Sequence, residues 1–403
     1  MLKKILLFLV AAICLFVLFI YVLVKYSKIP EPFAQNTQSA AWSESGQYTV
    51  LGSGFTLRDE SRETPTHTLM PHFKGLPYRQ LETTVWYPES QENEGHPLIV
   101  YSHAFMSERG DIHYILQNLS SRGYIVLAAN YPLTNNTTGD TILMADVVNQ
   151  PGDVSFLIDQ ITNPATEIGK NIAHLIDQDR IGLMGYSLGG LTTALTAYHP
   201  TYLDQRIKAA VSIAGPSAML GKAFYQTNNI PFMMLAGTAD EMATYKEHGE
   251  VILERVDNSV LVGIKGGSHL GFGGMAAFLR WADNPDSVAC WLMAKKMESL
   301  GVERGPIERA WYPELGTIEQ GIIYDDPSMA CNPNGPERIA LNPLRQQMLS
   351  KVAVVSFLES VFNALPSERE KAKAFLKTQL SFENDDVQVM GKYLENRTTI
   401  SGL

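Results

Sequence analysis

Short, wholly apolar runs alternate with segments of helix length through the middle of this chain. Successive apolar residues in so short a run are typical of strands that are buried on both faces of a sheet. Residues 112–121 and 154–161 have the length of helices and separate such runs. This alternation predicts an α/β fold with a mainly parallel central sheet, helices on both faces and right-handed crossovers. The runs are residues 98–101, 124–129, 181–184, 209–214, 232–236 and 260–264.

Two earlier segments have a different period. Residues 47–57 and 81–87 alternate apolar and polar side chains, which is the pattern of strands with one buried face and one exposed face. Such alternation is common in antiparallel sheets and rare in strands that helices cover on both sides. We therefore expect antiparallel strands ahead of the parallel part of the sheet.

The N-terminal segment is far more apolar than the rest of the chain. Residues 5–24 are twenty residues without a charge or a proline. A helix of that length crosses about 30 Å of hydrocarbon. A cleaved signal peptide would have a shorter apolar core and a small-residue cleavage site. Residues 1–28 are therefore predicted to form an uncleaved membrane anchor, and the polar residues 29–46 are predicted to form a linker.

The charges on either side of this apolar segment give a slight bias in orientation. Lys3, Lys4 and the amino terminus lie on one side, whereas Lys25 and Lys28 lie on the other. The positive-inside rule then favours placing the large domain, residues 47–403, on the periplasmic or extracellular side.

Composition limits the partners and cofactors of the chain. Its net charge of −10 argues against binding nucleic acid through a basic surface. It has no C-x-x-C or H-E-x-x-H motif, so no metal site and no other cofactor is expected. Besides Cys14 in the apolar segment, Cys290 and Cys331 could close one disulfide in an oxidising compartment. Two unrelated buried thiols are the alternative.

A motif for nucleophilic chemistry follows the run at residues 181–184. Gly185-Tyr186-Ser187-Leu188-Gly189 joins this run to a small-residue segment, residues 190–198. This is the strand, sharp turn and helix of a nucleophile elbow, which presents a serine hydroxyl at the end of a strand. The two glycines let the backbone bend and let the helix and the strand approach. Ser187 is therefore the candidate nucleophile, with a serine helix cap as the alternative interpretation.

Candidate partners of Ser187 follow the next buried runs. Asp240 comes just after residues 232–236, and His269 comes just after residues 260–264. Active residues of parallel sheets gather at the carboxyl ends of the strands. The chain order serine, acid, histidine is also that of the α/β-hydrolase fold. Glu241 is the substitute acid if Asp240 points away.

A serine nucleophile also needs hydrogen-bond donors for the negative oxygen that forms when it attacks a carbonyl group. One donor is expected to be the backbone N–H of Leu188, which directly follows the nucleophile at the start of a helix. The loop at residues 102–105, after the run at residues 98–101, should supply the second. We assign this second donor to the N–H of Phe105.

With these residues in view, the chain resembles the α/β-hydrolase branch that contains platelet-activating-factor acetylhydrolases and dienelactone hydrolases. It resembles the cutinase-like polyester hydrolases more distantly. The resemblance covers about residues 47–270 and 342–380, and residues 352–365 are similar to the closing helix of that branch. The matching segments are residues 82–88, 97–103 and 123–126, together with the strand-end motifs of Ser187, Asp240 and His269.

This resemblance implies an acyl-enzyme mechanism and has two departures. Ser187 would attack an ester, His269 would transfer the proton and Asp240 would orient the imidazole. The family usually has glycine after the loop histidine, where this chain has Ala104, whose methyl group restricts the backbone. An insertion at residues 270–341 precedes the closing helix, and it is expected to form a lid over the acyl site or a small core of its own. Its aromatic residues include Trp281, Trp291, Trp311, Tyr312 and Tyr324.

The sequence therefore predicts a membrane-tethered serine hydrolase that cleaves a small or lipid-like carboxylic ester. An acyltransferase or a peptidase could use the same three residues, because an acyl-enzyme reacts with water and with other acceptors. A third hypothesis is a catalytically silent anchored domain that binds a partner through the insertion. The oligomeric state is not predicted.

Overall fold

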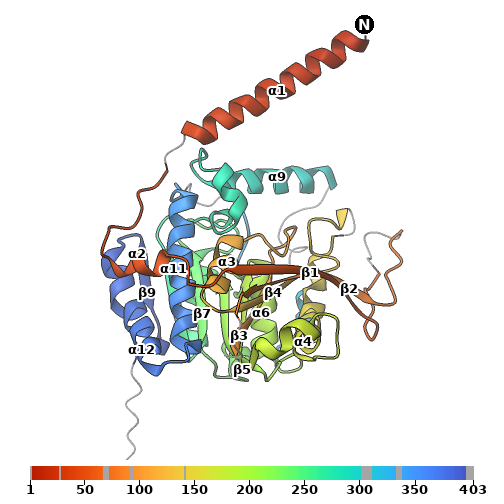
Figure 1. Ribbon diagram of the computed structural model, residues 1–403. Coiled ribbons are helices and arrows are strands. Elements are labelled where there is room, and N and C mark those ends of the chain that lie inside the picture. Colours follow the sequence, from red (N-terminus) through yellow and green to blue (C-terminus); the bar gives the residue numbers. More distant parts are fainter. Residues whose placement is uncertain are drawn as a thin grey trace, which may run out of the picture.

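Nine strands form one mixed sheet in the part of the chain that the computed structural model describes, namely residues 2–26, 29–66, 72–90, 95–139, 142–300, 311–332 and 338–395 (Figure 1). Their order across the sheet is β1-β2-β4-β3-β5-β6-β7-β8-β9. The strands are β1 (Val50–Asp59), β2 (Arg79–Pro88), β3 (His96–Ser102), β4 (Ile125–Asn130), β5 (Ile176–Tyr186), β6 (Ile207–Ile213), β7 (Phe232–Gly237), β8 (Ser259–Ile264) and β9 (Val387–Met390).

The directions of the strands confirm the predicted α/β class. The six strands β4, β3, β5, β6, β7 and β8 are parallel to one another. The β1 strand pairs antiparallel with β2, and β2 pairs antiparallel with β4, as the alternating segments predict. The edge strand β9 is antiparallel to β8 and was not predicted. With four residues, of which only Val387 is buried, it has no apolar run that a pattern could detect.

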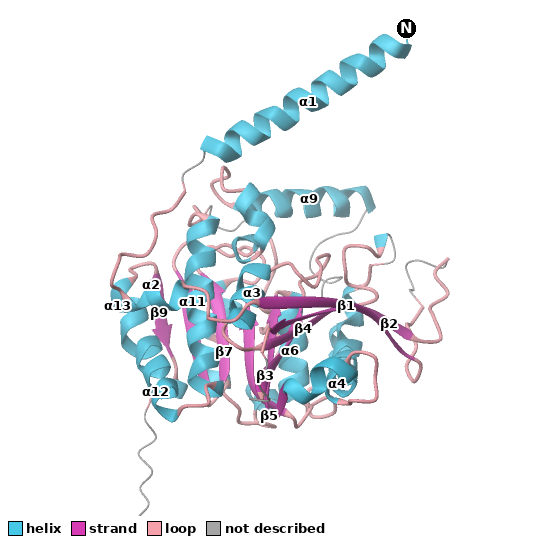
Figure 2. Cartoon of the chain, in the orientation of Figure 1, coloured by secondary structure: helices cyan, strands magenta, loops and turns pink. Residues whose placement is uncertain are grey.

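Helices cover both faces of the sheet (Figure 2). Side chains alternate between the faces along each strand, so Val100 of β3 packs in one core and Ile99 in the other. Helices α4 and α6 complete the first core, and α3 and α11 complete the second. The α-helices are α1 (Leu2–Tyr26), α2 (Gln38–Ser43), α3 (His113–Ser121), α4 (Gln150–Thr162), α5 (Gly169–Ile172), α6 (Leu188–Tyr198), α7 (Lys222–Tyr225), α8 (Ile252–Arg255), α9 (Pro285–Leu300), α11 (Pro343–Phe362), α12 (Pro366–Ala374) and α13 (Leu380–Glu383). Short 3₁₀ and π helices are η2 (Met144–Asn149), η3 (Ala173–Leu175), η4 (Tyr245–Glu250), η5 (Leu270–Phe272), η6 (Gly274–Phe278), η7 (Tyr312–Leu315), η8 (Phe375–Gln379) and η9 (Lys392–Leu394).

The apolar N-terminal segment forms the single long helix α1, which extends away from the sheet and its helices (Figure 1). Within it, Lys3–Val22 is long and apolar enough to cross a membrane, and none of that stretch is buried in the structure. The boundaries of the predicted anchor, residues 1, 27 and 28, lie outside the described residues.

Part of the segment predicted as a linker is packed on the fold. Phe33 is buried, and the guanidinium of Arg345 in α11 lies 5.0 Å from the centre of its ring. Helix α2 begins after Thr37, whose hydroxyl accepts a hydrogen bond from the N–H of Ala40. The N–H of Ser39 donates to Glu383 of α13 at 2.7 Å. The end of this segment is therefore held against the C-terminal helices rather than extended between two bodies.

The insertion at residues 270–341 contains η5, η6, α9 and η7 and follows β8. A disulfide joins Cys290 of α9 to Cys331, so the first of the two interpretations of these cysteines holds. Residues 301–310 and 333–337 of the insertion lie outside the described residues. The helix α11 that follows is not the last, because α12, α13 and β9 come after it.

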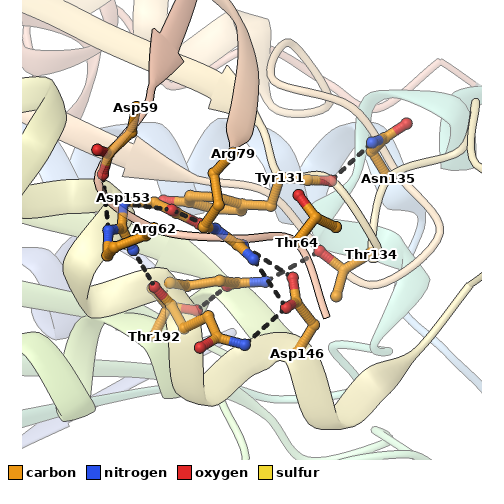
Figure 3. A network of polar contacts seen from close by, with 12 residues as sticks. Asp59, Arg62, Thr64, Arg79, Tyr131, Thr134, Asn135, Asp146, Asp153 and Thr192 are labelled. Carbon is orange, nitrogen blue, oxygen red and sulfur yellow. Dashed lines mark hydrogen bonds and ion pairs between the residues drawn. The ribbon is translucent and has the colours of Figure 1, made fainter. Parts of the chain in front are cut away.

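A buried ionic cluster fastens β2 to the helical layer over the first core (Figure 3). The Arg79 side chain is 1% exposed, and it donates two hydrogen bonds to Asp153 in α4, both at 2.6 Å. It donates two more to Asp146 in η2, at 3.0 and 2.9 Å. Arg62 donates to Asp153 from the partly exposed side at 2.8 Å. The cluster therefore leaves no charge of Arg79 or the two aspartates unpaired in the interior.

We expect Arg79→Ala to lower the free energy of unfolding by about 3–5 kcal/mol, because it leaves buried Asp146 without its cation and buried Asp153 with Arg62 alone. Chemical denaturation of the full-length chain in detergent measures this change. The matched control is Lys371→Ala, which removes a cation paired with Glu368 at the surface, where the Lys371 side chain is 71% exposed. An exposed pair of this kind contributes about 1 kcal/mol or less. Equal losses in the two variants would contradict the prediction.

Candidate active site

Ser187 occupies a sharp turn between the end of β5 and the start of α6. Its φ of 53° and ψ of −120° lie in a region that residues with a side chain rarely adopt. Its N–H donates to the carbonyl of Ile213 in β6 at 2.8 Å, which holds the turn. A Cβ atom at Gly185 would lie 1.9 Å from the carbonyl oxygen of Gly189, and one at Gly189 would lie 2.0 Å from that of Ser102. Only glycine fits at both positions, so the motif is a structural requirement of this turn.

His269 and Asp240 lie beside Ser187, each in the loop after its strand. The Nε2 atom of His269 is 2.8 Å from the Ser187 hydroxyl oxygen, and its Nδ1 atom is 2.8 Å from Oδ2 of Asp240. A carboxylate only accepts hydrogen bonds, so Nδ1 carries the proton and Nε2 accepts from the serine hydroxyl. The other oxygen of Asp240 accepts the N–H groups of Met242 and Ala243, at 2.8 and 2.7 Å. This arrangement fixes both the tautomer and the orientation of the imidazole.

Glu241, the substitute acid, points elsewhere. Its carboxylate accepts a hydrogen bond from the side-chain amide of Asn284 at 3.2 Å. Its backbone N–H donates to Asp286 at 3.1 Å. Asp240 is therefore the acid that the structure places against His269.

The surroundings of His269 favour its charged form. Burial by itself lowers the pKa of His269, but the charge of Asp240, its hydrogen bond and the charge of Asp286 together raise this pKa above the ordinary value of 6.5. The imidazolium cation that forms when a base takes a proton is thereby stabilised.

The two backbone N–H groups predicted to hold an oxyanion belong to residues close to this turn in the fold. Leu188 is the first residue of α6, so its N–H has no partner within the helix. Phe105 lies in the loop after β3, beside residues 102 and 103, whose carbonyls closely approach Gly189. Among the described residues, neither the Leu188 nor the Phe105 N–H donates a hydrogen bond. Both remain predicted donors to a developing oxyanion.

The loop that carries Phe105 is fixed by buried polar groups. His103 accepts the N–H of Tyr131 at Nε2, 3.1 Å away, so its Nδ1 carries the proton and donates to the Ala104 carbonyl at 2.7 Å. Burial lowers the pKa of His103 to about 4, which keeps the ring neutral and this arrangement intact. The N–H of Ala104 donates to Asp111 at 3.1 Å, and Met106 donates to the carbonyl of Thr134 at 2.8 Å.

Ala104, the departure from the expected glycine, fits this loop without backbone strain. Ala104 is not among the described residues with positive φ, so its methyl group does not force an unfavourable conformation. The neighbouring Met106 does have a positive φ, of 59°.

Two contacts of His269 were not predicted from the sequence. The hydroxyl of Tyr186 donates to the His269 carbonyl at 2.9 Å, and the two rings lie 5.6 Å apart. Asp286 accepts the N–H of His269 at 2.7 Å. Tyr186 stands inside the elbow motif and could have been suspected, whereas Asp286 follows Asn284-Pro285 in a pattern that indicates only a helix start.

The aromatic residues of the insertion fall into two groups. Tyr312 is buried in the first core, and Trp311 and Tyr324 pack against it. Trp281 and Trp291 are 46% and 60% exposed. The first group therefore belongs to the main core of the fold, and the second lies on the surface of the insertion.

No group of three or more histidine, cysteine or acidic residues within the described ranges is arranged to hold a metal ion. The groups that the structure brings together at Ser187 are the side chains of His269 and Asp240.

The fold and the arrangement at Ser187 define an α/β-hydrolase fold with a serine, a histidine and an aspartate in hydrogen-bond contact at its strand ends. Residues 81–278 match the family described as "PETase: PET hydrolase-like". Among solved structures, a ferulic acid esterase from Streptomyces cinnamoneus covers 79% of this chain and 92% of its own, with a TM-score of 0.50 and 18% identity. That likeness establishes the fold alone.

Two curated proteins are also similar in sequence. "Putative esterase YitV" of Bacillus subtilis (strain 168) is 31% identical over 134 residues, which are 32% of this chain and 48% of that protein. "Cutinase est1" of Thermobifida alba is 23% identical over 177 residues, which are 44% of this chain and 52% of that protein. The chain thus spans about half the length of the curated relatives that it matches.

We expect Asp240→Asn to lower the pKa of His269, because it removes the negative charge that most favours the imidazolium. Titration of the full-length chain by NMR, with labelled histidine, measures this pKa. The matched control is Glu241→Gln, which removes the neighbouring charge from a side chain that does not contact the imidazole, and it should change the pKa far less. A larger decrease in the control would assign the acid to Glu241 instead.

Proposed function

We propose that this protein is a serine hydrolase that cleaves carboxylic esters through an acyl-enzyme on Ser187. The observation that carries the proposal is the chain of contacts from the Ser187 hydroxyl through His269 to Asp240, with both distances at 2.8 Å. A serine hydroxyl is a weak nucleophile at neutral pH and reacts when an oriented base takes its proton. His269 is such a base, and Asp240 orients it.

The reaction has two balanced halves. Ser187 Oγ bonds to the ester carbonyl carbon as its proton passes to Nε2 of His269, and the N–H groups of Phe105 and Leu188 hold the resulting oxyanion. The carbon–oxygen bond to the leaving alcohol then breaks, and His269 returns the proton to that alcohol. Water attacks the acyl-enzyme in the same way and releases the acid, which restores Ser187.

The comparisons support an ester rather than another acyl substrate. The relatives bear the names esterase and cutinase, and the matching family is described as PET hydrolase-like. Hydrolysis of an ester bond is common to these descriptions. The closer resemblance to platelet-activating-factor acetylhydrolases and dienelactone hydrolases stays a prediction from the sequence.

The surface of the insertion supports an apolar, lipid-like ester. Five large apolar side chains in its first part are exposed, and contiguous exposed apolar surface of this kind commonly marks a binding site for an apolar partner. An acyl-chain-length profile tests this, since activity on long chains supports a lipid-like ester and activity on short chains alone supports a small acyl group. The side chains are Met275, Phe278, Trp281, Trp291 and Leu292.

We further propose that α1 anchors the enzyme in a membrane, with the hydrolase fold on the non-cytoplasmic side. The apolar stretch Lys3–Val22 supports the anchor. The disulfide between Cys290 and Cys331 supports an oxidising compartment, because cytosolic thiols are kept reduced.

A fluorophosphonate probe should label the full-length chain in detergent, and Ser187→Ala should abolish both labelling and ester hydrolysis, because the probe reacts with an activated serine. The control Ser53→Ala changes a partly exposed serine on the edge strand β1 and should keep both. A folded wild-type chain that neither reacts with the probe nor turns over esters would point to the silent binding domain. Transfer of the acyl group to an added alcohol or amine in preference to water would point to the acyltransferase.

The proposal also sets the pH dependence of catalysis. His269 accepts a proton in the first step, so it must be neutral in the free enzyme, and its pKa is raised above 6.5. We therefore expect kcat/KM to fall as the pH falls through a value above 6.5 and to reach a plateau on the alkaline side. Initial rates across a pH series measure this acid limb. A limb well below 6.5 would contradict the role given to His269.

A further inference from the structure

A second buried carboxylate lies beside the proposed catalytic residues. Asp286 stands in the first turn of α9, within the insertion, and it is fully buried. The proposed mechanism does not use it. A buried carboxylate without a cation among its bonded partners needs an explanation, because burial strongly disfavours its charge.

The carboxylate of Asp286 joins the two loops that carry Asp240 and His269. Its Oδ2 accepts the N–H of His269 at 2.7 Å and that of Glu241 at 3.1 Å. Its Oδ1 accepts the N–H of Leu270 at 2.8 Å. Glu241 directly follows the acid, and Leu270 directly follows the histidine. One side chain therefore fixes the backbone on both sides of the hydrogen bond between Asp240 and His269.

The insertion holds Asp286 in this place through its neighbours. Asn284 accepts the N–H of Asp286 at 3.0 Å, and its amide donates to the carbonyl of Ala239, on the other side of the acid, at 3.2 Å. The disulfide joins Cys290 of α9 to Cys331, and the N–H of Cys331 donates to the Glu241 carbonyl at 2.5 Å. The insertion therefore contacts the loop that carries Asp240 through several residues. Of these, Asp286 also bonds to His269.

We propose that Asp286 is a positioning residue that locks the Asp240–His269 pair in its working geometry and supplies a second negative charge to the imidazolium. This inference rests on the proposed function and deepens it. It assigns to the insertion a part in the active site, in addition to any role as a lid.

The charges around His269 set the direction of the expected effect. Burial and the charge of Asp240 raise the pKa of Asp286 to about 7, while His269 and the donated N–H groups lower it. The ionised form of Asp286 contributes to raising the pKa of His269. Removing that charge therefore lowers the pKa of His269. The titratable or charged groups that face His269 or Asp286 are Asp240 and Glu241 in the acid loop, Tyr186 at the end of β5, His248 in η4, and Arg338, which donates to the Asp240 carbonyl.

The test is Asp286→Asn in the full-length chain, with short acyl esters as substrates. An amide can accept two of the three N–H groups but presents its own donor to the third, so the loops shift. We expect kcat to fall by about 100-fold, because a displacement near 1 Å has an effect of this size, with KM nearly unchanged because the Asp286 carboxylate is fully buried and bonded to backbone N–H groups. The acid limb of kcat/KM should move to lower pH by about one unit. The control Asp283→Asn removes an exposed charge three residues away and should leave both unchanged.

Three outcomes would overturn the inference. A folded Asp286→Asn with wild-type kcat would exclude positioning, and a lower kcat with a lower melting temperature but an unmoved limb would leave only a structural role. If Asp286→Asn does not fold, Asp286→Glu carries the test, since it keeps the charge and displaces the carboxylate. Asp286→Glu should lower kcat and leave the acid limb of kcat/KM at the same pH. An unchanged kcat in this variant would exclude positioning.

The failure of this inference is distinct from that of the proposed function. A wild-type chain without hydrolysis or probe labelling would remove the proposed function. The pKa of His269, followed by NMR in wild type, Asp286→Asn and Asp283→Asn, would then still report whether Asp286 acts on the histidine. A fall in Asp286→Asn alone supports the inference, and equal values in all three chains overturn it.

Discussion

The hydrogen bond between His269 and Asp240 joins the loops after two neighbouring strands, β8 and β7, and the arrangement at Ser187 depends on it. It fixes which nitrogen of the imidazole accepts from the serine hydroxyl, and it offsets the effect of burial on the pKa of His269. The parallel sheet makes the bond possible, because the carboxyl ends of its strands lie along one edge. The Ser187 hydroxyl lies at the same edge, because Ser187 occupies a strained turn after β5 that the close packing of Gly185 and Gly189 makes possible.

The fold and the three central residues could be predicted because both follow from local patterns. Buried strands appear as apolar runs, a strained turn between strand and helix requires glycines, and polar residues beyond strand ends must meet. The remaining features depend on contacts between segments that are distant in the sequence, and the hydrophobic pattern of the sequence does not reveal such contacts. The burial of Phe33 against α11, the pairing of β9 with β8 and the approach of Asp286 to the loops that carry Asp240 and His269 are of this kind.

The buried charged groups lie in two settings that differ in net charge. In the cluster around Arg79, the cations Arg79 and Arg62 are paired with the carboxylates of Asp146 and Asp153, so their charges balance. Around His269, two carboxylates flank one imidazole, and the nearby Arg338 donates to the backbone carbonyl of Asp240. In the first setting each buried charge is paired with an opposite one, and the second setting is most favourable when the imidazole carries a proton. The contrast separates a structural cluster from a site suited to proton transfer.

The docking of Phe33 and α2 on the C-terminal helices also limits where an anchored enzyme can work. Only residues 27–32 then separate α1 from the fold, a length of chain that reaches at most about 20 Å. An enzyme anchored through α1, as proposed, would stay in a thin layer next to the lipid headgroups, where membrane-bound substrates are concentrated. The rate on a membrane-bound substrate would then follow the surface density of that substrate, whereas a dissolved substrate would reach the enzyme at its bulk concentration.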